Sequence, residues 1–246
     1  TVQSTHGAFD EKIAIIGGGP AGLSAAYYLA QMGYKPTVFE KNPIPGGMLT
    51  YGIPSSKLEK DVIPAEIDII KELGAEIKCG VEVGKDITIA QLKEQGYKAF
   101  YIAIGCQGGR TAGVPGEDAA GIQTAVALLR TVGGDESHKM TGKTVVIGGG
   151  NVAIDAARVA LRCGSSDVTM VCLEPREKMP ASAEEIAEAE EEGTAIRCGY
   201  GPKEFLTKDG HVCGVVLKRC TGLYDAEGRF APTYDESVTI TLPCDN

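Results

Sequence analysis

Two glycine-rich motifs in this 246-residue sequence have the spacing of a loop that binds a pyrophosphate. Residues 17–22 read GGGPAG, and residues 148–153 read GGGNVA. In such a loop the first glycine allows a tight turn and the second lets the backbone approach the phosphates. The third small residue allows the helix and strand to pack closely. Each motif therefore predicts a phosphate bound to free N–H groups at a helix N-terminus.

A glutamate follows each motif at the end of the next predicted strand. Glu40 comes about 20 residues after the first motif, where a carboxylate can accept both hydroxyls of an adenosine ribose. Glu174 ends the predicted strand 168–174, where a carboxylate binds the 2′-hydroxyl of NAD and repels the 2′-phosphate of NADP. Arg176 and Lys178 follow closely and could reach a phosphate. We therefore expect NAD at the second site, with NADP as the alternative.

The loop after Glu40 favours FAD at the first site. Residues 45–49, PGGML, offer backbone without side chains where an extended cofactor would run from the ribose toward its ring system. The alternative is an ordinary surface loop. A flavin site and a nicotinamide site together imply hydride transfer from nicotinamide C4 to flavin N5, a step that needs no acid–base residue. No catalytic residue is assigned.

The elements that would position these residues follow a repeated order. Residues 12–16 predict a buried strand, the motif opens a helix that ends at Gly33, and residues 36–40 predict a second parallel strand. The sequence from Lys143 aligns with that from Lys12 without a gap, which indicates two copies of one architecture.

The remaining segments give less regular patterns. A helix over about 57–73, with a possible kink at Pro64, and strands near 75–83 are expected in the first copy. In the second, the acidic segment 181–193 predicts a solvated helix face, and short strands and hairpins follow from about residue 203, with a turn at Asp209-Gly210.

Composition excludes several classes of protein. The net charge of −9 argues against nucleic acid as a partner, and no apolar run is long enough for a membrane span. The sequence begins without the pattern of a secretory signal. None of the eight cysteines forms a C-x-x-C pair, so no dithiol motif or metal site is predicted, and we expect a reducing cytoplasm. His6, His138 and His211 lie in polar or turn contexts and are expected to be bystanders.

Seven motifs in order carry a resemblance over essentially the whole chain: GGGPAGL, VFEKNPIPGGML, YGIPSSKL, YIAIGCQGG, VPGED, VVIGGGNVAIDAAR and REKMPAS. The sequence resembles the small subunit of glutamate synthase, the flavin-and-nicotinamide part of dihydropyrimidine dehydrogenase, and related subunits of ferredoxin-linked enzymes. The resemblance implies an α/β fold like that of the pyridine nucleotide-disulfide oxidoreductases, with two Rossmann-like domains in tandem and short β-hairpins after the second. We expect an FAD-binding domain at 1–112 and an NAD(P)-binding domain at 113–246.

The resemblance also implies partners and roles. Electrons would leave the flavin for an iron–sulfur domain or subunit, within a hetero-oligomer. Lys57 stands where relatives carry a basic residue near the FAD phosphates, and Val83 where backbone meets adenine. The predicted cofactor-binding residues are Gly17, Gly19, Pro20, Ala21, Gly22, Glu40, Lys41, Gly47, Met48, Leu49, Lys57, Val83 and Gly105 in the first domain, and Gly148, Gly150, Asn151, Val152, Glu174 and Arg176 in the second.

Three departures from the resemblance qualify these expectations. Relatives carry a cysteine-rich iron–sulfur domain ahead of the FAD domain and a return segment after the nicotinamide domain, and we interpret this sequence as a fragment without either. Relatives that use NADPH tend to have arginines where this chain has Leu173 and Glu174, which favours NADH.

Two other functions remain open at this point. The missing C-x-x-C argues against a thioredoxin-reductase-like dithiol enzyme. The alternatives to an FAD-dependent NAD(P)H oxidoreductase subunit are a nucleotide-binding module or fragment without turnover and a ferredoxin-linked electron-transfer subunit, with or without electron bifurcation.

Overall fold

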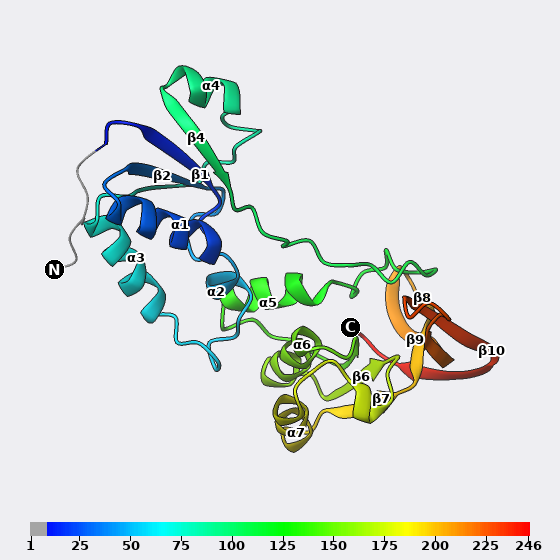
Figure 1. The fold of residues 1–246 in the computed structure, drawn as a ribbon. Coiled ribbons are helices and arrows are strands. Elements are labelled where there is room, and N and C mark those ends of the chain that lie inside the picture. Colours follow the sequence, from blue (N-terminus) through cyan, green and yellow to red (C-terminus); the bar gives the residue numbers. More distant parts are fainter. Residues whose placement is uncertain (1–8) are drawn as a thin grey trace. The chain divides into compact units, whose positions relative to one another are not determined.

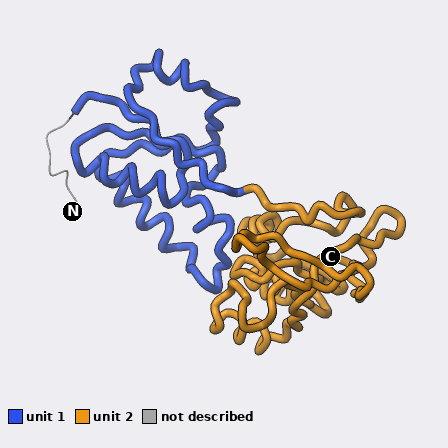
Figure 2. Tube along the Cα trace, turned by 45° about the vertical axis from the view of Figure 1, so that its right-hand side comes forward, with its two compact units in different colours: residues 1–107 blue, residues 108–246 orange. Residues whose placement is uncertain are grey.

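The computed structural model describes residues 9–246, so His6 lies outside the described residues. The chain divides into two compact units, one ending at Gln107 and one beginning at Gly108 (Figure 2). The boundary therefore falls in the glycine-rich stretch that follows the last strand of the first unit.

Unit 1 is built on a four-stranded sheet in the order β3-β2-β1-β4. All of its strand pairs are parallel. The strands are β1 (Lys12–Ile16), β2 (Lys35–Glu40), β3 (Glu76–Cys79) and β4 (Tyr97–Ile102). Because parallel strands need crossover connections, the polypeptide between them forms helices.

Helices cover both faces of this sheet, and the alternation of side chains along the strands explains how. Ile15 and Val38 face α1 (Pro20–Gln31) and α3 (Val62–Glu72), which lie side by side (Figure 1). Their neighbours Ala14 and Phe39 point to the opposite face, where they pack with Leu92 of α4 (Ile89–Glu94). A one-turn helix, α2 (Met48–Tyr51), lies in the glycine-rich loop after β2.

Two expectations for unit 1 were wrong in detail. The predicted helix 57–73 begins only at Val62, and Pro64 lies in its first turn. Pro64 does not break the helix there. Proline lacks a backbone N–H, but a residue in the first turn has no intrahelical acceptor for that group, so no hydrogen bond is lost. The strand expected near 75–83 ends at Cys79, so Val83 lies in a loop and forms an isolated bridge with Ile87.

Unit 2 repeats the parallel sheet and its helices. The strands β5 (Lys143–Ile147), β6 (Asp167–Cys172) and β7 (Ala195–Cys198) are parallel, in the order β5-β6-β7. One face packs against α5 (Ala125–Gly134), α6 (Asn151–Arg162) and α7 (Ala183–Glu191). A 3₁₀ turn, η1 (Arg176–Lys178), lies between β6 and α7.

An antiparallel sheet covers the other face of β5 and β6. Its strands are β8 (Tyr200–Lys208), β9 (His211–Tyr224) and β10 (Phe230–Pro243), in the order β10-β9-β8 (Figure 1). Val171 of β6 packs with Val212, Val215 and Leu217 of β9. The predicted turn at Asp209-Gly210 is confirmed, but β9 and β10 have 14 residues each and are not the short strands expected.

The predicted fold class is confirmed: an α/β protein with parallel sheets, followed by antiparallel β-structure. Residues 244–246 run beside β5, where Val145 donates to the Asn246 carbonyl and Asp245 donates to the Lys143 carbonyl. In the described part of the chain, no helix is long and apolar enough to cross a membrane.

Candidate functional site

The first glycine motif forms a tight turn between β1 and α1. Gly17 has φ +109°, and its N–H donates to the Phe39 carbonyl at 2.8 Å. A Cβ on Gly17 would stand 2.2 Å from the Ala103 carbonyl oxygen, just beyond β4. Glycine is therefore required both for the backbone angle and for the approach of the neighbouring strand.

The third residue of the motif has different space for a side chain in the two units. A Cβ on Gly22 would lie 1.9 Å from the Gly17 carbonyl oxygen, so the first turn of α1 packs directly on the loop. Ala153, at the same position in unit 2, has its Cβ 3.2 Å from where a Cβ on Gly148 would be. The second turn thus has space for one methyl group, which the first does not have.

Glu40 is held under the first turn by backbone and side-chain donors. It is 4% exposed, and its Oε2 accepts a 2.7 Å hydrogen bond from the Gly18 N–H. Its Oε1 accepts two more from Asn42, one from the backbone N–H and one from Nδ2, each at 2.7 Å. Since a carboxylate offers about four acceptor positions, roughly one remains for a ribose hydroxyl, fewer than the two that the sequence suggested.

The loop after β2 packs against the turn. Gly46 donates to the Gly18 carbonyl at 2.7 Å, and a Cβ on Gly47 would stand 2.8 Å from the Gly19 Cα. Gly47 has φ +57° and is the residue before α2. The two glycine segments thus form a continuous surface of backbone, which fits an extended pyrophosphate-containing cofactor.

Lys60, which no sequence motif singled out, fixes this loop from behind. Its ammonium is partly buried and donates to the Leu49 carbonyl at 2.7 Å and to the Ile53 carbonyl at 2.5 Å. These carbonyls lie on either side of the end of α2, where a cation is favoured. Lys57 was expected near the FAD phosphates, which stays a prediction, and Lys60, three positions further on, is the lysine that holds the loop through these two carbonyls.

The second motif repeats the backbone contacts of the first. Gly148 donates to the Val171 carbonyl at 2.8 Å, as Gly17 does to Phe39, and Ala181 donates to the Gly149 carbonyl at 3.0 Å, as Gly46 does to Gly18. In addition, Asn151 at the start of α6 accepts a 3.0 Å bond from the Ser182 N–H through its side-chain oxygen. The segment before α7, at Ala181 and Ser182, therefore packs against the second turn and stabilises it.

Glu174 approaches the second turn as Glu40 approaches the first. It lies two residues beyond the end of β6, and its Oε2 is 2.9 Å from the position of a Cβ on Gly149. Unlike Glu40 it is partly exposed, and no residue in the range 9–246 donates a hydrogen bond to its carboxylate. Both of its oxygens can therefore accept hydrogen bonds from a ribose.

The acidic helix α7 is not simply a solvated face, as the sequence had suggested. Its residues Ile186 and Ala189 are buried. Arg158 of α6 pairs with Glu188 and, at 2.6 Å, with Glu192, the C-cap of α7. Burial acts to raise the pKa of Glu192, but hydrogen bonds from Arg158 and Arg162 outweigh it, and the pKa is lowered. Arg176 pairs with Glu190 at 2.5 Å, and both side chains are a little under half exposed.

The remaining predicted residues differ in their exposure and in their place in the fold. Met48 and Leu49 are partly buried, and Lys41, Lys57 and Gly105 are exposed. Pro20 and Ala21 form the first turn of α1, and Asn151 and Val152 the first turn of α6. Val83 packs on the cluster around Phe39. The assignment of all these residues to cofactor binding stays a prediction.

Three sulfur atoms lie together at the ends of β6 and β7, and the Cys172 sulfur is 3.5 Å from the Glu174 backbone carbonyl oxygen. The Cys172 and Cys198 sulfurs, on paired positions of β6 and β7, are 3.7 Å apart, and the Cys198 sulfur is 3.9 Å from that of Met179. Burial, together with the neighbouring Cys198, raises the pKa of the Cys172 thiol to about 12. Among the described residues, no group of three or more His, Cys, Asp or Glu is placed to hold a metal ion.

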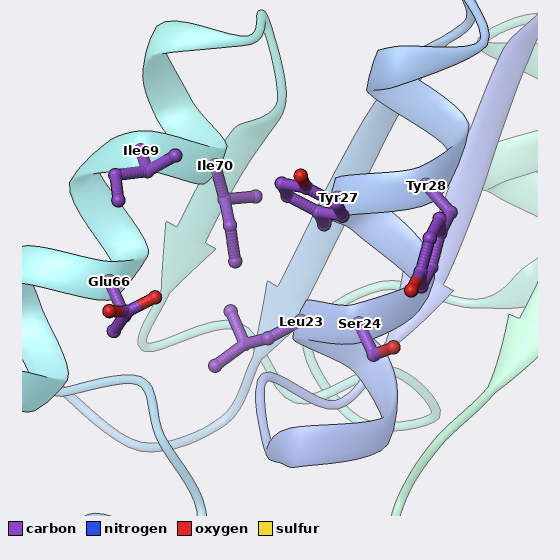
Figure 3. A pocket seen from close by; sticks show the side chains of 7 residues that line it. All are labelled: Leu23, Ser24, Tyr27, Tyr28, Glu66, Ile69 and Ile70. Atoms are coloured by element: carbon purple, nitrogen blue, oxygen red, sulfur yellow. The ribbon is translucent and has the colours of Figure 1, made fainter. Parts of the chain in front are cut away.

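A shallow groove lies between α1 and α3, and none of the predicted cofactor-binding residues lines it (Figure 3). Leu23 and Ile70 form its floor, Tyr27 and Tyr28 line one side, and Glu66 is its single charged residue. None of the turn glycines lines it. The backbone cradles at the two glycine motifs, and not this groove, match the chemistry of a dinucleotide.

A comparison with protein families decides the classification. The model of the family described as pyridine nucleotide-disulphide oxidoreductase matches residues 11–228. This chain belongs to the pyridine nucleotide-disulphide oxidoreductase family. The predicted enzyme class, an oxidoreductase, is therefore confirmed.

Known relatives agree with this classification. The chain is 43% identical over 239 residues to the NADP(+)-dependent formate dehydrogenase subunit beta of Moorella thermoacetica, covering 96% of this chain and 34% of that protein. It is 36% identical to the glutamate synthase [NADPH] small chain of Halomonas elongata, covering 96% of this chain and 52% of that protein. The predicted resemblance to glutamate synthase small subunits is confirmed, and the chain spans a third to a half of these relatives.

A solved structure supports the fold. Mycobacterium tuberculosis FprA in complex with NADPH matches with a TM-score of 0.81 at 21% identity, over 96% of this chain and 69% of that one. At this identity the likeness shows the fold alone.

The packing at the third position of each motif predicts that a methyl group is tolerated in the second turn and not in the first. Gly22→Ala places a Cβ 1.9 Å from a backbone oxygen and should cost about 3 kcal/mol of unfolding free energy or more. The matched change Ala153→Gly should cost only about 1 kcal/mol, through helix propensity. Urea denaturation of both variants measures the difference, and equal costs would contradict the packing described for the first turn.

The raised pKa of Cys172 predicts its reactivity. Its thiol should stay protonated and resist iodoacetamide at pH 8, whereas the exposed Cys106 and Cys213 react. Because the folded-state pKa lies above the unfolded value, the associated stability is complete below pH 9 and decreases as the pH rises toward 12. Peptide mapping after timed alkylation checks this, and rapid native labelling of Cys172 would refute it.

Proposed function

We propose that this chain is the electron-input part of a flavoprotein, with FAD in unit 1 and a nicotinamide nucleotide in unit 2. One observation carries the proposal. In each unit a carboxylate at the end of the second parallel strand, or two residues beyond it, reaches the middle glycine of a strand–turn–helix motif, at Gly18 and at Gly149. This arrangement fits an adenosine ribose beside a pyrophosphate.

The chain's own residues would bind and orient the two cofactors. In unit 1, the N–H groups at the start of α1 face the pyrophosphate position, and Glu40 offers a hydroxyl acceptor. The Gly46–Gly47 backbone packs against the turn at Gly19 and would line the cofactor where it continues past the ribose. In unit 2, the start of α6 and Glu174 have the corresponding roles. When both cofactors are bound, the nicotinamide and flavin supply the hydride-transfer chemistry.

For the nucleotide, we propose NADH in preference to NADPH. The Glu174 carboxylate is partly exposed and receives no hydrogen bond from residues 9–246, so it can bind a free 2′-hydroxyl and would repel a phosphate. NADPH is the second candidate because both relatives named above carry NADP(+) or NADPH in their names. We favour NADH because the charge at Glu174 is negative, and a negative charge disfavours the 2′-phosphate of NADPH.

For the partner, we propose an iron–sulfur domain or subunit in a hetero-oligomer of the cytoplasm. The subunit character of both relatives supports an assembly, and the eight free cysteines support a reducing compartment. The iron–sulfur acceptor rests on the resemblance alone. Isolation of the intact complex and measurement of its iron and labile sulfide test it, and a complex without either would exclude it.

A direct experiment tests the main proposal. The intact subunit that contains this chain should keep bound FAD and its yellow colour after unbound flavin is removed, and the flavin absorbance should bleach anaerobically on addition of NADH. Absence of flavin binding, or bound flavin that neither NADH nor NADPH reduces, would reject the enzyme in favour of a nucleotide-binding module without turnover.

The nucleotide preference has its own prediction. Glu174→Gln should reduce kcat/KM for NADH about tenfold, because a charge-assisted hydrogen bond to the ribose is weakened. The rate with NADPH should stay unchanged or rise. Stopped-flow bleaching with each nucleotide measures both, and faster reduction of the parent protein by NADPH would refute the preference.

Lys60 gives a further test of the FAD site. Lys60→Met removes two hydrogen bonds that hold the loop around Gly47, so the Kd for FAD should rise about tenfold. Lys60→Arg should recover part of this loss. Lys71→Met, which removes an exposed ion pair with Asp68, is the control and should leave the Kd unchanged. Flavin fluorescence titration gives the values, and equal effects of Lys60→Met and Lys71→Met would contradict the role of Lys60.

A further inference from the structure

Recognition of a 2′-phosphate needs a cation near the end of β6, and this chain has one candidate within two residues of Glu174. Arg176 lies in η1, and its guanidinium has the fork geometry that suits a phosphate. If Arg176 were available, it would offset the repulsion that Glu174 exerts on the 2′-phosphate. Its availability therefore bears on the choice between the two nucleotides.

The Arg176 guanidinium is already engaged. Its NH2 group donates to Glu190 Oε2 at 2.5 Å, a contact between η1 and α7. The neighbouring carboxylates Glu188 and Glu192 are occupied with Arg158. Glu190 is thus the carboxylate of this helix region that pairs with Arg176.

The exposure of this pair limits its effect. The two side chains are 45% and 44% exposed, and ion pairs of this kind are weak in water. NADPH could break this ion pair at a small cost in free energy. The pair would therefore change the preference for NADH over NADPH by only a few-fold. Glu190 would also add a second negative charge near the phosphate position, which acts in the same direction.

We infer that Glu190 is a specificity-determining residue of the second nucleotide site, since it withholds Arg176 from a 2′-phosphate. This inference rests on the proposed function of unit 2. It assigns the NADH preference to two carboxylates with different roles. Glu174 accepts the 2′-hydroxyl directly, and Glu190 acts through Arg176.

The test uses nucleotide fragments, so that it does not depend on flavin loading. Adenosine 2′,5′-bisphosphate carries the 2′-phosphate, and AMP carries the free hydroxyl. Calorimetric titration should show that Glu190→Gln tightens the bisphosphate about two- to fivefold and leaves AMP unchanged. The double variant Glu190→Gln/Arg176→Gln should lose that gain, because the Arg176 guanidinium that Glu190→Gln releases is then absent.

Glu191→Gln is the matched control, since Glu191 is the next residue of α7 and forms no ion pair within residues 9–246. If Glu191→Gln tightens binding of the bisphosphate as much as Glu190→Gln does, the effect comes from overall surface charge and the inference is overturned. It is also overturned if Glu190→Gln changes the affinity for both fragments equally. If the parent protein binds neither fragment, the proposed function of unit 2 itself fails. Thermal unfolding midpoints confirm that each variant is folded.

Discussion

The contact between a carboxylate and the middle glycine of a turn is the constraint on which the rest of each unit depends. For Glu40 to reach Gly18, β1 and β2 must be parallel neighbours, and the crossover helix α1 must begin directly at the turn. The loop after β2 must then turn back, which Gly46 and Gly47 allow. Buried side chains on both faces of the sheet hold this arrangement, so the core and the site are specified together.

The two units meet this constraint differently, and the difference separates structure from binding. Glu40 is buried and already accepts three hydrogen bonds from the protein, so much of its role is to fix the turn. Glu174 is partly exposed and accepts no hydrogen bond within residues 9–246, so it can respond to whatever binds. A carboxylate with most of its acceptor positions filled by the protein orders its surroundings, whereas an exposed carboxylate without such bonds can discriminate between ligands.

The features that the sequence predicted correctly are those that depend on short stretches of neighbouring residues. The glycine turns, the parallel strands and the turn at Asp209-Gly210 follow from short patterns, and the structure has each of them. The contact of Lys60 with the loop and the pairing of Arg176 with Glu190 depend on where separate elements meet, and no spacing rule indicates them. The start of α3 and the length of β9 likewise depend on tertiary packing and strand pairing, which override local propensity.

Strand β10 has a consequence for how this chain behaves at high concentration. It is an edge strand of 14 residues, long enough to recruit a strand from another molecule. However, it contains Pro232 and Pro243, the acidic pair Asp235 and Glu236, and three shifts of register against β9. Proline removes backbone donors, charge repels a second copy, and the irregular register prevents a flat edge. The strand that closes unit 2 is therefore also its protection against edge-to-edge aggregation.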